Sequence, residues 1–143
     1  MGYGKARFGM TVEQVKQALG DPFSGQRDQG VACYFLVPRG KDALPYLTLM
    51  IEGGKFVRYD VGNDTLIAPG GGKRGMPSGQ LDVLYRNALQ DAPHKFVQDG
   101  KYRSIAASGV APSTLVFETG AAGKVTEWHV GVSPQADYTE GCE

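Results

Sequence analysis

The chain has 143 residues, a length that suits one compact domain or two small halves that share a core. Hydrophobic residues make up 41% and charged residues 21%, proportions that are ordinary for a folded globular protein and exclude a disordered chain. Lys plus Arg and Asp plus Glu both number 15, so no net charge attracts phosphate backbones or an anionic membrane, and we expect no nucleic-acid partner.

The start of the chain lacks a targeting signal. Met1–Lys5 has none of the apolar stretch of a signal peptide, and no run approaches the about 20 apolar residues of a membrane-spanning helix. We therefore expect a protein that does not span a membrane and, if it is exported, one whose leader has been removed.

The stretch "RFGMTVEQVKQALGDP" carries the signals of a complete short helix. Thr11 and Gln14 have the spacing of a capping box, in which each side chain bonds the backbone N–H of the other. Gly20 predicts the end of the helix, and Pro22 stands beyond it. One apolar face is expected, made by Val12, Val15, Ala18 and Leu19.

A second helix is predicted after Gly75-Met76. Its cap is expected at Ser78, after Pro77. Its apolar stripe is expected at Leu81, Leu84, Tyr85, Ala88 and Leu89. Strand-forming segments follow each helix: "VACYFLVP", "YLTLMIE" and "KFVRYDV" after the first, and "KYRSIAAS", "STLVFET" and "KVTEWHVGV" after the second.

The two halves of the sequence repeat one another. Gly9-Met10 recurs as Gly75-Met76, an offset of 66 residues, and the offset becomes 69 after a longer turn in the second half. Insertions in turns are tolerated, so ordered matches with one insertion indicate a duplication. We predict an α+β fold of tandem helix-plus-antiparallel-sheet units, 1–67 and 68–143, in one pseudo-symmetric domain with the helices packed on one face of the sheet.

Side-chain alternation in the last strand of each half predicts which residues face the helices. Tyr59 and Trp128 are expected under the helices as core anchors, with Val57, Val61, Thr126 and Val130 beside them. The opposite face mixes large apolar groups, both charge signs and a histidine, which favours a partner-binding surface over a simple solvated one. The predicted partner-binding residues are Met50, Phe56, Arg58, Asp60, Val116, Val125, Glu127 and His129.

The two cysteines, Cys33 and Cys142, lie 109 positions apart, outside the spacing of metal sites and redox motifs. A cysteine at the extreme C-terminus has little core to enter, so we expect a disulfide that fastens the tail to the first half. Two reduced thiols in a cytosolic protein are the alternative, because disulfides persist in oxidising compartments.

These motifs resemble two known families. "GMTVEQVKQALGDP" resembles the G-M-T-x-x-x-V-x-x-x-L-G-x-P opening of the SmpA/OmlA outer-membrane lipoproteins, and the duplicated helix followed by strands resembles the beta-lactamase inhibitor protein fold. The resemblance implies an exported, non-catalytic protein of the bacterial envelope, periplasmic or secreted, whose sheet presents a concave binding face. Inhibition of a beta-lactamase is an analogy at the level of the fold.

Catalytic and cofactor motifs find little support in the sequence. His94 and His129 are accompanied by no G-x-S-x-G elbow or H-E-x-x-H helix. "PGGGKRG" departs from a phosphate-binding loop at Ile67 and Arg74, so we interpret Ala68–Gly75 as a connector. Asp60, Asn63 and Asp64 lack the spacing of an EF-hand and predict a polar turn. We expect no enzyme activity, no metal and no cofactor.

Two functions therefore remain. The first is an exported module, expected to be a monomer, that binds a protein, with an enzyme that it inhibits as one form of partner. The second is a structural envelope component that assists outer-membrane assembly through a lipid anchor. A small-molecule or sugar-binding domain is a third reading, which a deep pocket between the two halves would favour.

Overall fold

The computed structural model describes residues 2–20, 23–24, 32–41, 43–107 and 112–142. Its strands are β1 (Gly2–Tyr3), β2 (Ala6–Arg7), β3 (Phe23–Ser24), β4 (Cys33–Pro38), β5 (Leu47–Glu52), β6 (Lys55–Val61), β7 (Gln90–Pro93), β8 (Lys101–Ala106), β9 (Ser113–Thr119) and β10 (Val125–Val132). Its helices are α1 (Val12–Leu19), α2 (Ser78–Leu84) and the short 3-10 helix η1 (Gln135–Asp137).

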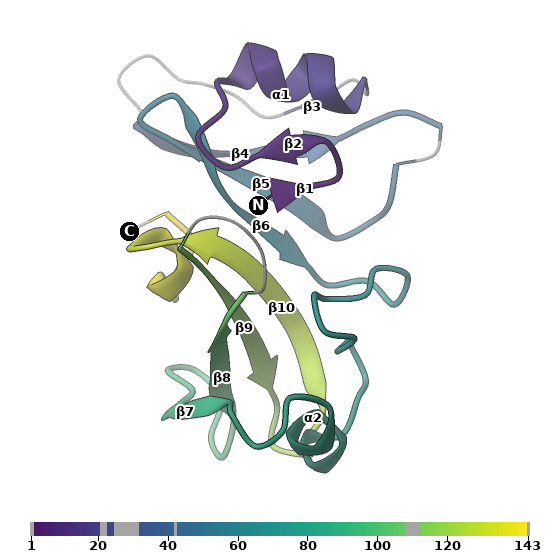
Figure 1. Ribbon diagram of the computed structural model, residues 1–143, viewed down its shortest axis with the longest axis vertical. Helices are drawn as coiled ribbons and strands as arrows, with labels where there is room; N and C mark the ends of the chain where they lie inside the picture. Colours follow the sequence, from purple (N-terminus) through teal and green to yellow (C-terminus); the bar gives the residue numbers. More distant parts are fainter. Residues whose placement is uncertain (1, 21–22, 25–31, 42, 108–111, 143) are drawn as a thin grey trace.

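The fold is built on one eight-stranded sheet in the order β3-β4-β5-β6-β10-β9-β8-β7. Every pair of neighbouring strands is antiparallel, and β1 and β2 form a separate antiparallel hairpin. Figure 1 shows α1 and α2 at opposite ends of the molecule, with β6 and β10 side by side across its middle. The prediction of an α+β protein with an antiparallel sheet is confirmed.

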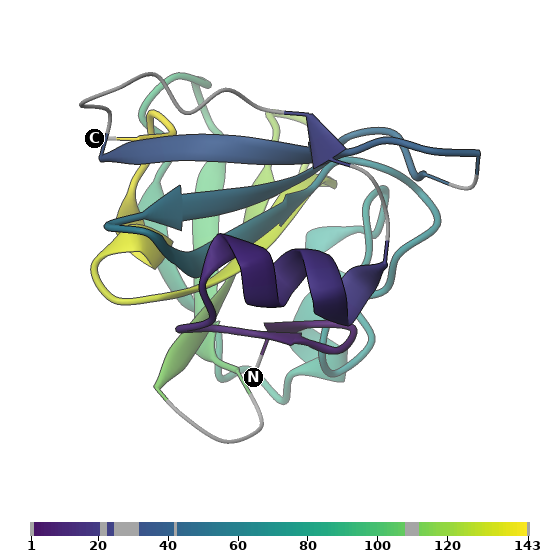
Figure 2. The same ribbon diagram turned by 90° about the horizontal axis from the view of Figure 1, so that it is seen from above.

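Helix α1 forms as its local signals predict. The amide of Gln14 donates to Thr11 Oγ1 at 3.3 Å, and the amide of Thr11 donates to Gln14 Oε1 at 2.9 Å, which completes the capping box. Gly20 ends the helix in the left-handed region at φ 71°. Val15 is fully buried, and the helix lies along the β1–β2 hairpin (Figure 2).

Each Gly-Met pair joins the start of its helix to a strand. The amide of Gly9 donates to Phe56 O at 2.8 Å, and that of Phe56 donates to Met10 O at 2.9 Å. In the second half the amide of Gly75 donates to Val125 O at 2.8 Å, and that of Val125 donates to Met76 O at 3.0 Å. Both glycines have positive φ, 94° and 88°, which explains the residue type. The same two backbone hydrogen bonds thus occur in each half.

Helix α2 is shorter than its apolar stripe predicts. It ends at Leu84, because Arg86 and Asn87 adopt left-handed conformations with φ of 55° and 56°. The predicted cap at Ser78 is also wrong: Pro77 holds the cap position without a side-chain bond, and Ser78 Oγ accepts from Arg103 instead, at 3.1 Å. Tertiary contacts therefore outweigh the local helix signals here.

One buried cluster joins the two halves. Val15 of α1 and Leu81 of α2 belong to it, together with Tyr59 of β6 and Trp128 of β10. The rings of Tyr59 and Trp128 meet edge-on with centroids 5.8 Å apart, so their predicted core positions are confirmed. Burial, aided by neighbouring Tyr3, raises the pKa of Tyr59 to about 12, which keeps its hydroxyl neutral.

The central strands β6 and β10 are hydrogen-bonded to each other in the middle of the sheet. Asp60 lies opposite His129, Tyr59 lies opposite Val130, and Val61 lies opposite Trp128. The sheet is also irregular at two places, where Val57 of β6 and Thr126 of β10 are skipped in the pairing with the neighbouring strand. These two residues are β-bulges, and each reverses the side-chain alternation of its strand.

Candidate functional site

We call the sheet face that carries Asp60 and His129 the open face, because it lies opposite the cluster of Tyr59 and Trp128. Cross-strand pairing places Thr48, Asp60, His129, Val116 and Ser104 in one row across this face. The row brings together three of the predicted partner-binding residues from both halves of the chain.

The bulges place two predicted binding residues on the wrong face. Phe56 and Val125 were expected on the face away from the helices, but both lie in the buried cluster, with exposed fractions of 0% and 2%. The ring of Phe56 contacts that of Phe8 at a centroid distance of 4.9 Å. The extra residue of each bulge, Val57 or Thr126, turns the preceding side chain to the helix side. Phe56 and Val125 therefore belong to the core of the fold and not to its open face.

Thr126 was expected beneath the helices and is instead exposed to solvent. Val57 was expected there too, but although it is buried it lies outside the buried cluster on the helix side. Both corrections have the same cause as those of Phe56 and Val125, because a bulged residue leaves the regular alternation.

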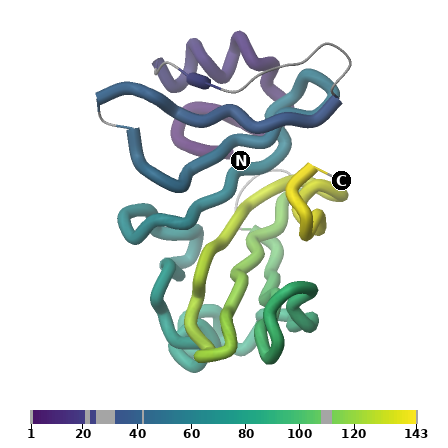
Figure 3. The backbone as a smooth tube through the Cα atoms, turned by 180° about the vertical axis from the view of Figure 1, so that it is seen from behind, coloured from purple at the N-terminus to yellow at the C-terminus, as the bar shows by residue number. Residues whose placement is uncertain are grey.

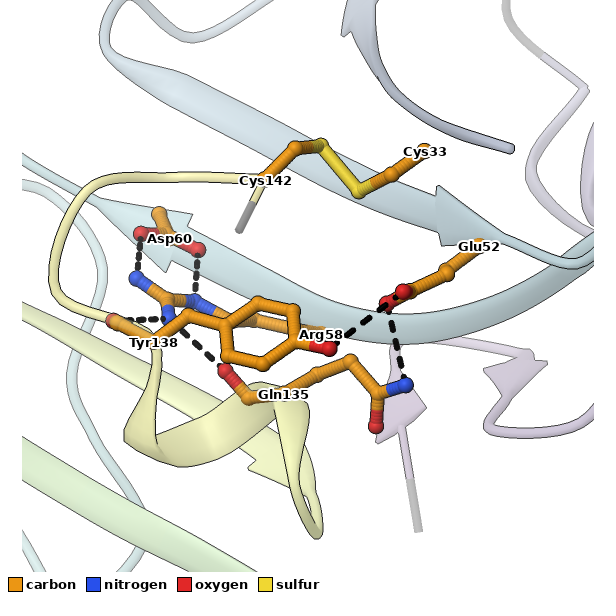
Figure 4. The surroundings of a disulfide bond; sticks show 7 residues. All are labelled: Cys33, Glu52, Arg58, Asp60, Gln135, Tyr138 and Cys142. Atoms are coloured by element: carbon orange, nitrogen blue, oxygen red, sulfur yellow. Dashed lines mark hydrogen bonds and ion pairs between the residues drawn. A yellow bond between two sulfur atoms is a disulfide. The ribbon is translucent and has the colours of Figure 1, made fainter. Parts of the chain in front are cut away.

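The C-terminal segment, residues 134–142, covers the middle of the open face (Figures 3 and 4). Arg58 Nη1 donates to the carbonyl oxygens of Gln135 at 2.9 Å and Tyr138 at 2.8 Å. His129 Nε2 lies 2.6 Å from the carbonyl oxygen of Ala136. Arg58 and His129 are 4% and 3% exposed, so the protein's own segment contacts the groups that were predicted to meet a partner.

Two further contacts hold the C-terminal segment. Cys33 and Cys142 form a disulfide with Cα atoms 5.7 Å apart, as the sequence predicts. The two oxygens of the Glu52 carboxylate accept from Gln135 Nε2 at 3.0 Å and from Tyr138 OH at 3.3 Å. Figure 4 shows these contacts together with those of Arg58. The segment is thus joined to β4 and β5 as well as to β6 and β10.

Arg58 is bound within the chain on every side. Its Nε and Nη2 donate to the two oxygens of Asp60 at 2.7 and 2.6 Å, a bidentate pair, while Nη1 makes the two carbonyl bonds described above. The Asp60 side chain remains 30% exposed. Arg58 therefore stabilises the segment, whereas Asp60 still reaches solvent.

Met50 and Val116 lie on the open face as expected but are buried. Met50 pairs with Arg58 and is 0% exposed, and Val116 pairs with His129 and is 5% exposed. Glu127, by contrast, is exposed. Of the eight predicted residues, Asp60 and Glu127 are the ones with substantial solvent contact.

Glu127 belongs to a pair of carboxylates on neighbouring strands. It lies opposite Glu118, whose Oε1 is 2.7 Å from His94 Nε2. A hydrogen bond with Glu118, followed by burial and by repulsion from Glu118 and Asp60, raises the pKa of Glu127 to about 7, although His129 opposes the shift. Glu127 therefore keeps a proton for its hydrogen bond with Glu118 below neutral pH.

His129 is held as a neutral ring. Burial, followed by the nearby Arg58 guanidinium, lowers its pKa below the usual 6.5. A neutral imidazole carries one proton, and the short contact of Nε2 with the carbonyl of Ala136 places that proton on Nε2. Nδ1 is then an acceptor, and it has no hydrogen-bond partner among the described residues.

Within the described part of the chain, two hollows adjoin the centre of the open face, one beside Asp60 and one beside His129. The larger, about 500 Å³, is lined by residues that include Phe35, Tyr46, Thr48, Asp60 and Glu127, and we call it the tyrosine groove. The smaller, about 360 Å³, is lined by Val116 and His129 and by residues of the C-terminal segment, and we call it the segment cavity.

Tyr46 is the most prominent side chain of the tyrosine groove. It is 78% exposed, and its backbone has φ 53°, a conformation that is rare for an aromatic residue. The amide of Gly62 donates to Tyr46 O at 2.8 Å, and Asn63 Nδ2 donates to Pro45 O at 2.9 Å. These bonds hold the backbone of Tyr46 in its strained conformation. The exposed aromatic ring is therefore attached to a fixed backbone.

Among the described residues, no group of three or more His, Cys, Asp or Glu side chains is placed to hold a metal ion. Asp60 pairs with Arg58, and Asp64 with Arg74, while Asn63 Oδ1 accepts from the amides two and three residues ahead. In the same ranges, no helix has the length and apolar character to cross a membrane.

Comparison with known proteins gives no match to a family model, a curated protein or a solved structure.

The sequence reasoning missed most of the residues around the two hollows. The sequence patterns place Phe35, Tyr46, Tyr102 and Ser104 in strands and predict no binding role for them. The predicted disulfide was the available signal, since fastening Cys142 to Cys33 requires the preceding residues to pass close to the sheet.

Proposed function

We propose that the protein is an exported, non-catalytic module that binds another protein through the tyrosine groove. The observation that carries this proposal is the exposed ring of Tyr46 on a strained backbone, next to the exposed carboxylate of Glu127. Strain of this kind costs about 1–3 kcal/mol and is commonly retained at functional sites. Tyrosine is also enriched among the residues that dominate binding energy.

The charges of the groove favour a particular kind of partner surface. Asp60 and Glu127 supply carboxyl groups, that of Glu127 with its pKa raised to about 7, and Phe35 supplies apolar area beside Tyr46. Arg74 also lines the groove, but its guanidinium is paired with Asp64 at 2.9 Å. Such a groove suits a basic side chain that lies next to an apolar one. An enzyme inhibited by this contact is one form of such a partner.

The disulfide between Cys33 and Cys142 supports an oxidising compartment, periplasmic or extracellular. Disulfides are rare in reducing compartments, and this one fixes the segment that covers the open face.

The proposal includes a tandem duplication of 1–67 and 68–143. It is supported by the backbone hydrogen bonds that Gly9-Met10 and Gly75-Met76 each make to a strand in the same pattern. It is also supported by the bulges at Val57 and Thr126, which stand 69 positions apart. The pairing of β6 with β10 also supports the duplication, because Asp60 and His129 lie opposite each other and stand 69 positions apart.

The test places a photo-crosslinking amino acid at position 46 and, as a control, at position 83. Val83 is 80% exposed, on α2 and outside the groove. We expect crosslinks to one protein of an envelope extract from position 46 alone. Tyr46→Ala should then weaken binding of that protein by at least about 2 kcal/mol, and Val83→Ala should leave it unchanged. Equal affinity of both variants would contradict the proposal.

The second candidate, a lipid-anchored envelope component, rests on the Gly-Met helix motif and its confirmed cap. It is separated from the first by the mass of the protein isolated from cells in detergent. An added diacyl mass on an N-terminal cysteine supports anchoring, and a plain cleaved N-terminus supports the free binding module.

A further inference from the structure

The segment cavity is a second hollow, separate from the tyrosine groove. Its volume is about 360 Å³, which lies in the range of small-molecule sites. Its walls come from three parts of the molecule: the β7–β8 hairpin, the sheet strands β8 to β10, and the C-terminal segment. Because residues distant in sequence close around it, the disulfide that fixes the segment also fixes the cavity.

A buried acceptor lies in the wall of this cavity. His129 is 3% exposed and lines the cavity, and its Nδ1 has no hydrogen-bond partner within the described part of the chain. An unpaired buried acceptor is costly, and its cost is removed when a bound group donates to it. In the neutral ring, Nε2 carries the proton and donates it in a hydrogen bond to the carbonyl oxygen of Ala136. Nδ1 can therefore accept a hydrogen bond but cannot donate one.

The rest of the cavity has little net charge. Val116 and Ala136 give it apolar walls, and the two charged residues of its lining, Lys95 and Asp137, have opposite signs. Lys95 is further paired with Glu140 at 3.3 Å. An uncharged guest with an apolar body therefore suits the cavity better than an ion does.

We propose that the segment cavity binds a small, uncharged organic molecule whose apolar body packs on Val116 and whose hydroxyl group donates to His129 Nδ1. This site is additional to the proposed protein-binding groove and does not depend on it.

The test compares two probes of equal shape, p-cresol and p-xylene, of which only p-cresol has a hydroxyl donor. Titrations of the ¹⁵N-labelled protein should give p-cresol an affinity about fivefold higher, the usual worth of one neutral hydrogen bond. The ring nitrogens report the contact directly: the Nδ1 resonance of His129 should shift with p-cresol. His94 is an internal control, since its Nδ1 already accepts from the amides of Phe96 and Val97 at 3.1 Å.

Two variants assign the effect to the cavity and to the ring. Ala92→Phe, at an exposed position of the cavity wall, should block both probes, whereas Val83→Phe on α2 should not change binding. His129→Phe keeps a ring of similar size but has no Nδ1 acceptor, so the preference for p-cresol should disappear.

Each remaining outcome overturns the proposal. Equal affinity of the two probes would show an apolar hollow in which His129 does not recognise the ligand. Failure of both probes to bind at millimolar concentration would show that the cavity is not a ligand site. Binding that survives Ala92→Phe would place the probes elsewhere, and this variant decides the question even if His129→Phe does not fold.

Discussion

At the scale of single residues, Glu127 shows how an exposed side chain acquires an unusual titration. Its pKa is raised to about 7 by the hydrogen bond with Glu118, then by partial burial. The folded protein therefore keeps this proton to a higher pH than the unfolded chain does. Stability is fully present below the ordinary pKa of 4.5 and declines as pH rises towards 7.

We expect Glu127→Gln to remove that decline. The variant should gain stability relative to the natural protein between pH 4.5 and pH 8, by less than about 1 kcal/mol because the side chain is exposed to solvent. Urea unfolding at the two pH values measures the difference. Glu118→Gln is the control, since it should lower the pKa of Glu127 in a carboxyl NMR titration. A difference in stability that does not change with pH would contradict the raised pKa of Glu127.

Phe56 shows, at the same scale, where prediction from sequence stops. Side chains of a regular strand alternate between the two faces of the sheet, and this alternation places Phe56 with Arg58 on the open face. The extra residue at Val57 reverses that alternation, and the bulge depends on how β5 pairs with β6 rather than on any local signal. Tyr59 and Trp128 were predicted correctly, because each follows the bulge in its strand, where the side-chain alternation is regular.

At the scale of elements, local signals predicted α1 but not α2. The capping box and the terminal glycine of α1 act within one turn, so they are visible in the sequence. The end of α2 depends on tertiary contacts of Tyr85, which packs on Phe117 and donates to Pro69 O at 2.6 Å. The path of the C-terminal segment depends on long-range contacts as well, and only its disulfide was predictable.

The C-terminal segment supplies the prediction for this scale. Arg58→Ala leaves Asp60 without its cation and removes both bonds to the segment, so we expect a loss of about 2–4 kcal/mol in stability. Hydrogen exchange at the amides of Asp137 and Tyr138 should rise, even with the disulfide intact. The matched control is Arg74→Ala, whose ion pair with Asp64 is exposed and should be worth under about 1 kcal/mol. Unchanged exchange in Arg58→Ala would show that the disulfide alone holds the segment.

At the scale of the whole molecule, the two halves share one core. Tyr59 and Trp128 come from different halves and contact each other within the cluster that also receives α1 and α2. A core that both halves complete leaves neither with enough buried surface to be stable by itself. We therefore expect one cooperative unfolding transition. Fluorescence of Trp128, the single tryptophan of the chain, and far-ultraviolet circular dichroism should give the same midpoint in denaturant.

Two tyrosines provide the matched test of this shared core. Tyr59→Ala removes a ring that is 5% exposed, and it should shift the whole transition by about 3–5 kcal/mol as seen by both probes. Tyr46→Ala removes a ring that is 78% exposed, and it should change stability by about 0.5 kcal/mol or less. If Tyr59→Ala instead separates the fluorescence and dichroism transitions, the halves unfold independently. The contact of Tyr59 with Trp128 would then join two cores rather than lie within one.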